Sequence, residues 1–592
     1  MRFSATLLML AAASRVGGWT ISRPASGRLL RHAATSGQNP LSIIGSVGSR
    51  STICSMCAAA TEEKPKKKQQ QQQKKKGGGG GGGQGPKGIT PRGVDFSAWY
   101  NEVIAAADLV DQSPVKGCMV IKPYGMGLWE AVRSDLDDRI KASGAENAYF
   151  PLFIPVSFLS KEAEHVEGFA KECAVVTHHR LRSKTGEGEV GVEADPEAEL
   201  EEPLIVRPTS ETMIWHMFKN WIMSYRDLPL KVNQWANVVR WELRTRPFLR
   251  SAEFLWQEGH TAHATKEEAD DSAREMLDAY ADMASSLLAM PVVKGVKSPS
   301  ERFAGADETY TIEALMQNGW ALQSGTSHFL GQNFAKAFDV FFQTADNKQE
   351  LVWATSYGAS TRLIGALVMT HSDDLGLVLP PSVAPVQVIM VPISPKGPEK
   401  APEQHAELMA FVDKAVGQLK AAGVRVKVDE RWNMKPGPKF YEWEKKGVPL
   451  RIECGPRDIE AGTLLCARRA GGDGEKFALS NDETLASKVQ EELANMQAGL
   501  LAAAEKRMEE MTFEVDSYEE MAKALEGSDG SGSPGFFLVP WHCDAEAEEK
   551  VKKETKATIR CYPLDQQHKA EGKTCFMTGR PATHMALFAR AF

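Results

Sequence analysis

The stretch VNQWANVVRWELRTRPFLRSAEFLWQEGHTAH, residues 232–263, decides the fold that we expect for this chain. Apolar side chains recur with a period of two in its first half and share one face of a predicted strand: Trp235, Val239, Trp241 and Leu243. Arg240 and Glu242 fall on the opposite face, so we expect the guanidinium and the carboxylate to project together into a site.

A second strand-like run at residues 254–260 alternates in the same way. The side chains that share one of its faces are Phe254, Trp256, Glu258 and His260. The segment between the two runs carries Arg244, Arg246 and Arg250, which predicts an antiparallel hairpin with a cationic loop. An isolated Arg-x-Glu pair is more often an exposed ion pair on a sheet. Here the loop, the returning strand and RPTSET at 207–212 favour a polyanion site beside a small polar pocket.

These motifs resemble motif 2 of the class II aminoacyl-tRNA synthetases. RPTSET, followed by NQWANVVRWE (233–242) and FLWQEGHTAH (254–263), is similar to the prolyl-tRNA synthetases of the archaeal and eukaryotic type. GTSHFLGQNF (325–334) matches the family's substrate-pocket pattern, and we expect a strand and a tight Gly turn there. LVWATSYGASTRLIGALVMTH (351–371) resembles motif 3, and the resemblance covers about residues 95–592.

The resemblance implies an α+β multidomain protein. It places a class II antiparallel-sheet catalytic domain at 93–383, an α/β anticodon-binding domain at 384–482 and a small α/β C-terminal domain of the prolyl type at 483–592. Strands that alternate with helices after Val386 independently predict the mixed α/β domain. A long helix that runs into AYFPLFIPV (148–156) resembles motif 1, which implies a homodimer. The acidic segment 180–203 is predicted to be a surface loop.

The first 92 residues are excluded from the predicted fold. Residues 1–61 contain arginine but no Asp or Glu, which is typical of an organelle transit peptide for a plastid, chloroplast or mitochondrion. The apolar run at 5–13 would also suit a signal-peptide core, and a disordered cytoplasmic tail is the remaining alternative. Residues 62–92 form a Lys/Gln/Gly linker of low complexity, which cannot bury a core.

The overall composition is that of a soluble protein. The 592 residues carry a formal charge of -7 and 25% charged residues, so a nucleic-acid partner would need a local basic surface. Apolar runs fall short of membrane-spanning length. Nine scattered cysteines suggest free thiols in a reducing compartment.

The resemblance implies proline–tRNA ligase activity that would use ATP with Mg²⁺, with L-proline, ATP and tRNA(Pro) as the expected partners. The residues expected to be catalytic are Arg240, Glu242 and Arg362. Those expected to bind ATP are Arg240, Glu242, Arg250, Ser251, Gln323, Thr326, Ser360 and Arg362. Those expected to bind proline are Thr209, Glu211, Arg240, Trp256, Glu258 and His328. Read without the family, Thr209, Ser210 and Glu211 would more simply cap a helix, and His328 would be a core residue.

Two further expectations concern the remaining domains. The segment KGVPLRIECGPRDIEAG (446–462) makes four residues candidates for anticodon recognition: Arg451, Glu453, Arg457 and Asp458. Many relatives hold zinc in the C-terminal domain with four cysteines. This chain has only Cys543, Cys561 and Cys575 there, with Met577 at the fourth position, so we expect no metal. The alternative is a zinc site completed by His542, His568 or His584.

The alternatives are another class II enzyme, such as a threonyl-tRNA synthetase, and a catalytically inactive paralogue that binds RNA or a protein partner. The first would need zinc ligands in the amino-acid pocket, and the second is disfavoured because Arg240, Glu242 and Arg362 are all present. Only about a hundred residues separate His260 from Tyr357, so we expect no inserted editing domain in cis.

Overall fold

The computed structural model describes residues 88–160, 173–184, 190–470, 476–527 and 532–592. The expected transit peptide at 1–61 and most of the linker at 62–92 lie outside these ranges. Every helix within them is too short or too polar to cross a bilayer.

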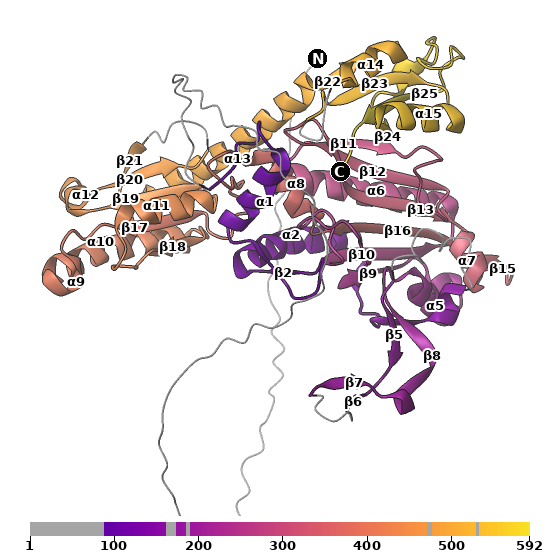
Figure 1. Cartoon of the computed structure of the whole chain (residues 1–592), viewed down its shortest axis with the longest axis horizontal. Coiled ribbons are helices and arrows are strands. Elements are labelled where there is room, and N and C mark those ends of the chain that lie inside the picture. The colour runs from indigo at the N-terminus through magenta and orange to yellow at the C-terminus, as the bar shows by residue number, and fades with distance from the viewer. Residues whose placement is uncertain (1–87, 161–172, 185–189, 471–475, 528–531) are drawn as a thin grey trace, which may run out of the picture. The chain divides into compact units, whose positions relative to one another are not determined.

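An eleven-stranded sheet is the framework on which the rest is built, in the order β22-β23-β25-β24-β11-β12-β13-β16-β10-β9-β3 (Figure 1). Its strands are β3 (Glu146–Asn147), β9 (Leu230–Val239), β10 (Glu253–His263), β11 (Val293–Val296), β12 (Glu308–Leu315), β13 (Ala321–Gly331), β16 (Trp353–Ser360), β22 (Thr512–Glu514), β23 (Phe536–Trp541), β24 (Thr558–Pro563) and β25 (His584–Ala589). Neighbouring strands are antiparallel except at the two edges, where β3 pairs with β9 and β22 with β23 in parallel. The predicted antiparallel catalytic sheet is confirmed.

The strands of the C-terminal domain continue the catalytic sheet. Strand β24 pairs with β11 through Gly295 opposite Pro563 and Val296 opposite Tyr562. A Cβ on Gly295 would lie 2.5 Å from the sulfur of Cys561, so only glycine allows this close approach. The sequence analysis did not foresee this junction.

Helices close one face of the sheet. Helix α6 (Lys266–Ser286) packs on β10, β12, β13 and β16, and α1 (Phe96–Ala106), α2 (Pro123–Ala142) and α8 (Arg362–His371) share its hydrophobic core. The hydroxyl of Tyr280 on α6 donates to Gln257 Oε1 at 2.6 Å. Thr265 caps α6 by accepting from the Glu268 N–H at 3.2 Å. Because side chains alternate along a strand, the neighbours of Gln257 on β10 face the opposite side.

The β9–β10 hairpin is present, but its first strand is shorter than predicted. β9 ends at Val239, and the last bond to its partner runs from the Arg240 N–H to the Ala252 carbonyl at 2.8 Å. The Glu242 N–H then bonds back to the Arg240 carbonyl at 2.7 Å, which turns the chain out of the sheet. Trp241 and Leu243 are 49% and 80% exposed, so their predicted place on a buried face was wrong.

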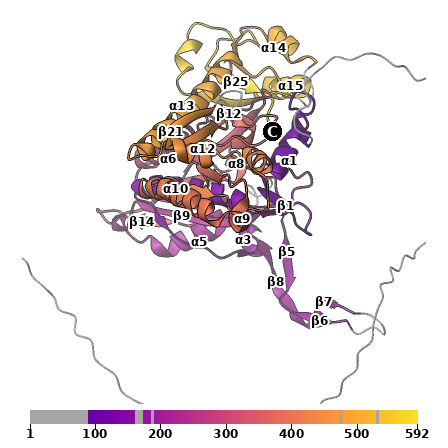
Figure 2. The same ribbon diagram turned by 90° about the vertical axis from the view of Figure 1, so that its left-hand side faces the viewer.

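The segment at 180–203, predicted to be a surface loop, forms strands in its described part. They are β6 (Leu181–Ser183), β7 (Val192–Ala194) and the first part of β8 (Glu199–Val206), with the short helix η2 (Pro196–Ala198) before β8. Strand β8 pairs with β5 (Val175–His178), which precedes the segment, and with β4 (Phe153–Pro155). The paired β6 and β7 lie at the far end of β5 and β8 (Figure 2). Cross-strand pairs support the arm: Arg180 with Asp195 at 2.8 Å and Arg182 with Glu193 at 2.9 Å.

The α/β domain after residue 384 has its own five-stranded sheet, in the order β18-β17-β19-β20-β21. Its elements are β17 (Val388–Pro392), α9 (Gly397–Lys400), α10 (Pro402–Ala421), β18 (Val426–Val428), α11 (Pro436–Lys445), β19 (Leu450–Cys454), α12 (Pro456–Ala461), β20 (Thr463–Arg468) and β21 (Lys476–Ser480). Helix α13 (Leu485–Glu510) then leads to α14 (Tyr518–Leu525) and α15 (Ala545–Thr555).

The remaining elements are short. They are β1 (Val110–Gln112), β2 (Met119–Ile121), α3 (Val156–Ser160), α5 (Glu211–Trp221), η3 (Tyr225–Asp227), α7 (Asn333–Phe338), β14 (Phe341–Gln343), β15 (Gln349–Leu351) and η4 (Gln567–Ala570). Helices α5 and α7 share a second hydrophobic core with β9, β10 and β16. This core places the start of α5, where RPTSET ends, beside strand β10.

Candidate active site

A cavity of about 290 Å³ opens on the sheet face formed by alternate residues of β10, β13 and β16. Its wall consists of Thr209, Glu211, Arg240, Phe254, Trp256, Glu258, His260, Lys297, Glu301, Phe303, Thr309, Gln323, Ser324, Gly325, Thr326, His328, Ser356, Tyr357, Gly358, Ala359, Ser360 and Arg362. On β10 a side chain at position 259 is impossible, because a Cβ on Gly259 would lie 2.0 Å from the Tyr357 ring. Glycine therefore keeps the strands close while Glu258 and His260 face the cavity.

The structure brings most of the predicted site residues to this cavity. Every residue expected to bind proline is in its wall: Thr209, Glu211, Arg240, Trp256, Glu258 and His328. The expected ATP ligands in the wall are Arg240, Gln323, Thr326, Ser360 and Arg362. Thr326 and His328 both lie on the single strand β13, which passes through Gly325 without the tight turn that was predicted.

Three expected ATP ligands, Glu242, Arg250 and Ser251, lie outside the cavity wall. They belong to the loop between β9 and β10, where Arg250 Nη1 lies 3.8 Å from Glu242 Oε2 and Ser251 is buried. Glu242 does not project beside Arg240 as predicted, because β9 ends one residue before Arg240 and the chain turns away.

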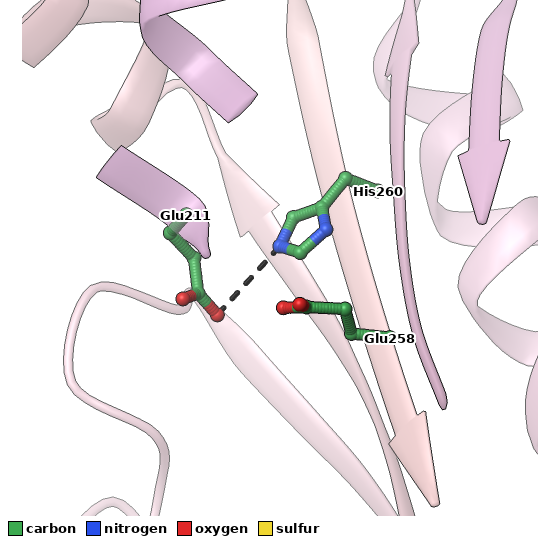
Figure 3. Close-up of side chains that lie close together, drawn as sticks. All are labelled: Glu211, Glu258 and His260. Carbon is green, nitrogen blue, oxygen red and sulfur yellow. Dashed lines mark ion pairs between the residues drawn. The ribbon is translucent and has the colours of Figure 1, made fainter. Parts of the chain in front are cut away.

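Two carboxylates and an imidazole meet at one end of the cavity (Figure 3). Glu211 enters from the first turn of α5, and Glu258 and His260 extend from β10. His260 Nε2 lies 3.6 Å from Glu211 Oε1, and all three residues are buried. Ser210 Oγ and Gln234 Nε2 donate to Glu258 Oε1 at 2.5 and 2.6 Å. Ser210 is therefore committed to Glu258, and its side chain makes no helix-capping hydrogen bond.

The two carboxyl groups differ in their preferred charge. Burial alone would raise the pKa of Glu211, but the neighbouring His260 ring and the Thr209 hydroxyl, which donates to Glu211, lower it to about 2. Burial raises the pKa of Glu258, and the negative charge of Glu211 adds to this effect against the opposing influence of His260. This end of the cavity therefore favours one carboxylate charge, on Glu211, and suits a small cation.

Within the described residues, these three side chains are the group whose donor atoms could hold a metal ion, since their ligand atoms lie within 4.8 Å of one another. Glu258 already accepts from Ser210 and Gln234 through its Oε1. A ligand with a cationic N–H group could donate to the remaining carboxylate oxygens of Glu211 and Glu258 as well as a metal ion could bind them. Trp256, whose ring forms part of the wall, adds an aromatic face that attracts cations.

The other end of the cavity is cationic. The Arg240 guanidinium lies 5.4 Å from the centre of the Trp256 ring, and its Nε donates to the Pro208 carbonyl at 3.0 Å. Arg362 is the first residue of α8, and burial together with repulsion from Arg240 and Arg250 lowers its pKa to about 10. Two neighbouring half-buried cations are stabilised by an anionic ligand, so this end suits phosphate groups.

Several polar atoms in the cavity wall lack a hydrogen-bond partner within the described chain. They are Trp256 Nε1, His260 Nδ1 and Ser356 Oγ. Buried polar atoms without partners are uncommon in proteins. Their concentration at one cavity is what a ligand site would show.

Sequence reasoning missed the wall formed by residues 297–309. This segment contributes Lys297, Glu301, Phe303 and Thr309, none of which belongs to a motif considered above. Thr309 Oγ1 lies 3.0 Å from His328 Nδ1, and the Phe303 ring centre lies 4.6 Å from that of His328. Burial lowers the pKa of His328 to about 4, so its imidazole is neutral near pH 7. The sequence does not show that this segment lies beside His328. Only the pairing of β12 with β13, which sets Thr309 opposite His328, brings the two together.

The four anticodon candidates lie in and beside β19. Arg451 Nε donates to Glu453 Oε1 at 3.1 Å, and Lys476 Nζ contacts Glu453 Oε2 at 2.8 Å. Asp458 accepts from the Gly455 N–H at 2.8 Å and so caps α12. Arg457 is exposed at the start of α12. Asp458 thus has a structural role and Arg451 is paired with Glu453, which leaves Arg457 as the exposed cation of the four.

The cysteines of the C-terminal domain are spread over separate places. Cys543 is exposed and Cys575 is buried in the domain core. Cys561 is buried against Gly295 at the sheet junction, where burial raises the pKa of its thiol. The C-terminal Phe592 packs its ring centre 5.0 Å from that of Trp320 at an angle of 45°, and the Arg246 guanidinium of the hairpin loop lies 5.6 Å from the Phe592 ring centre.

Comparison with known proteins finds three family models that match parts of the chain. Residues 193–371 match the tRNA synthetase class II core domain (G, H, P, S and T), residues 387–495 match an anticodon binding domain, and residues 518–592 match the C-terminal domain of prolyl-tRNA synthetase. Together with the antiparallel sheet and with Arg240 and Arg362 in the cavity wall, these matches define a class II aminoacyl-tRNA synthetase.

The relatives specify which one. Proline–tRNA ligases of Porphyromonas gingivalis and Bacteroides fragilis are 56% and 55% identical over 507 and 509 residues, which is 86% of this chain and 99% of each relative. The crystal structure of prolyl-tRNA synthetase from Cryptosporidium parvum, complexed with halofuginone and AMPPNP, superposes with a TM-score of 0.77 at 39% identity, covering 85% of this chain and 99% of that one. The chain belongs to the prolyl-tRNA synthetase family, and it is a class II ligase that joins proline to tRNA with the use of ATP.

Proposed function

We propose that the cavity on β10, β13 and β16 is where this ligase forms prolyl-adenylate before it transfers the prolyl group to tRNA(Pro). One observation carries the proposal: the same cavity has a carboxylate end at Glu211 and a cationic end at Arg240 and Arg362. Proline has a cationic ring nitrogen beside a carboxylate, and the carboxylate must meet the α-phosphate of ATP. The Glu211 end matches the cationic ring nitrogen, and the end with Arg240 and Arg362 matches the carboxylate and the phosphate.

At the acidic end, Glu211 and Thr209 accept hydrogen bonds from the secondary ammonium of proline. The Trp256 ring covers the pyrrolidine, and His328 with Glu258 closes the pocket. The fixed orientation of Glu258, held by Ser210 and Gln234, makes the pocket rigid. A small apolar pocket separates ligands by only about 1–3 kcal/mol per methylene, so we expect some activation of alanine and cysteine.

At the cationic end, Arg240 holds the proline carboxylate beside the α-phosphate. A carboxylate oxygen attacks the α-phosphorus, the bond to the bridging oxygen breaks, and pyrophosphate leaves with that electron pair. Arg362 contacts the outer phosphates from the start of α8, with Gln323, Thr326 and Ser360 completing the nucleotide subsite. Arg250, Ser251 and Glu242 would join when the hairpin loop closes on ATP. Magnesium enters as part of the MgATP substrate and offsets the triphosphate charge.

In the second step, a ribose hydroxyl at the 3′ end of tRNA attacks the prolyl carbonyl carbon, and AMP leaves. Neither step requires a covalent enzyme intermediate, so catalysis consists of positioning and charge stabilisation. The crystallised relative holds AMPPNP, an ATP analogue, which supports a nucleotide subsite in this chain as well.

The protein is further proposed to lack editing in cis. Residues 264–352, all described, form α6, β11 to β15 and α7, and each of these elements belongs to the catalytic part. Incubation of the purified protein with alanyl-tRNA(Pro) tests this proposal, which predicts hydrolysis no faster than in buffer. Rapid deacylation by the protein would contradict it.

We also propose the archaeal and eukaryotic subtype, a homodimer, and import into a plastid or mitochondrion. The motifs at 207–212 and 325–334 support the subtype, and the arginine-rich, acid-free composition of 1–61 supports import. Exposed apolar side chains, including Trp221, Met223 and Phe341, support a dimer surface. Sedimentation of the protein and imaging of a fusion of residues 1–92 to a fluorescent protein test these points; a monomer, or a fusion that stays in the cytoplasm, would contradict them.

The activation step is tested by amino-acid-dependent ATP–pyrophosphate exchange. Proline, threonine, alanine and cysteine are compared on wild-type protein and on Arg240→Ala. The proposal predicts fastest exchange with proline and loss of exchange in the variant. Folded wild-type protein that exchanges with threonine instead, or with no amino acid, would overturn it.

A further inference from the structure

A buried charge network connects the cavity wall to the C-terminal domain. Lys297, which follows β11 and lines the cavity, donates from Nζ to Glu313 Oε1 at 2.7 Å. Glu313 lies on β12 and is fully buried. Its other oxygen accepts from Arg560 Nε of β24 at 3.1 Å. The pairing of β24 with β11 is what brings Arg560 to this place.

The network has an excess of positive charge. One carboxylate, Glu313, faces two buried cations, and burial lowers the pKa of Lys297 while the neighbouring Glu313 opposes that change. The charges of Glu313 and Arg560 also act on Arg362. Glu301, which also lines the cavity and acts on Arg560, is paired with Lys552 of α15 at 3.3 Å. The wall around Lys297 therefore carries unbalanced positive charge next to the arginine that we assign to the phosphates.

A purely structural network would not need this arrangement. Buried ion pairs contribute little net stability compared with apolar residues of similar size, so a structural role alone does not account for an ammonium at this wall. Lys297 is 4% exposed, and its position in the wall is the feature that stability does not explain.

We propose that Lys297 is an additional active-site residue whose ammonium contacts the phosphates of ATP and the leaving pyrophosphate. Glu313 and Arg560 act as positioning residues: Glu313 orients the ammonium, and Arg560 fixes Glu313 from the C-terminal domain. The C-terminal domain thereby takes part in amino-acid activation without itself lining the cavity. This inference rests on the proposed prolyl-adenylate chemistry.

The test is ATP–pyrophosphate exchange with full-length protein, with KM values measured separately for ATP, pyrophosphate and proline. The variants are Lys297→Met, Lys297→Arg, Glu313→Gln and Arg560→Met. Lys294→Met is the matched control for the lysine, because Lys294 is on β11 but exposed and paired with Asp278 at 2.7 Å. Arg580→Met, in the same domain as Arg560 and half exposed, is the control for the arginine.

Lys297→Met is expected to raise the KM for ATP and pyrophosphate about tenfold or more, the effect of losing one charge-assisted hydrogen bond. The KM for proline should change less than about twofold on the same reasoning, and Lys297→Arg should recover most of the loss. Glu313→Gln and Arg560→Met should shift the KM for ATP in the same direction by a smaller factor, and the controls should not. The Kd of Lys297→Met for ATP, measured by calorimetry in the absence of proline, should rise by the same factor as its KM for ATP.

Three results would overturn the inference: an unchanged KM for ATP in Lys297→Met, equal rises for ATP and proline, or a loss seen only as a lower melting temperature. Absence of exchange in the wild-type protein would instead contradict the proposed function. The two failures are thus distinguishable.

Discussion

Glu211 gives the most informative single substitution in the cavity. Its pKa of about 2, against 4.5 for an ordinary glutamate, corresponds to a preference for the charged form of about 3 kcal/mol at about 1.4 kcal/mol per pKa unit. The His260 ring and the Thr209 hydroxyl create that preference against burial. Glu211→Gln keeps the shape of the side chain and removes the charge that we assign to the ring nitrogen of proline.

A hydrogen bond to a charged group contributes about 1.5–3 kcal/mol. We therefore expect kcat/KM for proline to fall about 10- to 100-fold in Glu211→Gln. The KM for ATP should change little, because the cationic end is left intact. Pyrophosphate exchange at varied proline and at varied ATP separates the two effects, and Glu267→Gln, an exposed position on α6, is the control.

The reasoning is refuted if kcat/KM for proline in Glu211→Gln stays within about threefold of the wild-type value while the protein melts normally. It is also refuted if the KM values for ATP and proline rise together. In that case Glu211 would support the cavity as a whole, and the ammonium of proline would bind elsewhere.

Three further outcomes are expected. Asp373→Asn removes the partner of buried Arg469, whose two Nη atoms donate to Asp373 at 2.8 and 2.7 Å; urea titration should show a loss of about 1–3 kcal/mol, and an unchanged midpoint would contradict this. Gly259→Ala places a Cβ inside the Tyr357 ring; overpacking should cost at least about 1–3 kcal/mol, and a variant with wild-type melting and proline KM would show that the strands can separate freely. Burial and the nearby Lys231 lower the pKa of His263 to about 4. The contribution of the neutral His263 ring to stability is therefore full above the ordinary pKa of 6.5 and is lost as the pH falls from about 6.5 to 4. His263→Gln should flatten the decline in the free energy of unfolding over that interval, and an equally steep decline would exclude His263 as its cause.

Local patterns in the sequence predicted the centre of the molecule well. The alternation at 254–260 placed Trp256, Glu258 and His260 on one face, and the strand β10 has that register. This works because a period of two determines the side of a strand whatever its partner. The helix that begins at Glu211 and the helix that begins at Arg362 follow equally from local signals.

Features that depend on distant pairing were not predictable in this way. The junction of β24 with β11 joins residues more than two hundred and fifty positions apart, and no periodicity encodes it. Lys297 belongs to the cavity only through that sheet order. Trp241 and Leu243 were misplaced because the backbone bonds that end β9 are not visible in an apolar pattern.

The arm around β6 and β7 was missed for a different reason. Its residues are mostly polar and exposed, so they carry no hydrophobic alternation. The arm is supported by cross-strand ion pairs such as Arg182 with Glu193. Charged residues at such spacing occur equally often in loops, which is why a loop was predicted.

The central claim is that one cavity receives the ammonium of proline at Glu211 and the phosphate at Arg240. Calorimetric binding of a non-hydrolysable prolyl-adenylate analogue tests it most directly, with wild-type protein, Glu211→Gln and Arg240→Ala measured side by side. The account predicts that each substitution weakens binding of the analogue at least about tenfold, and that proline and ATP each compete with it. Undiminished binding in both variants, with the protein folded, would contradict the account.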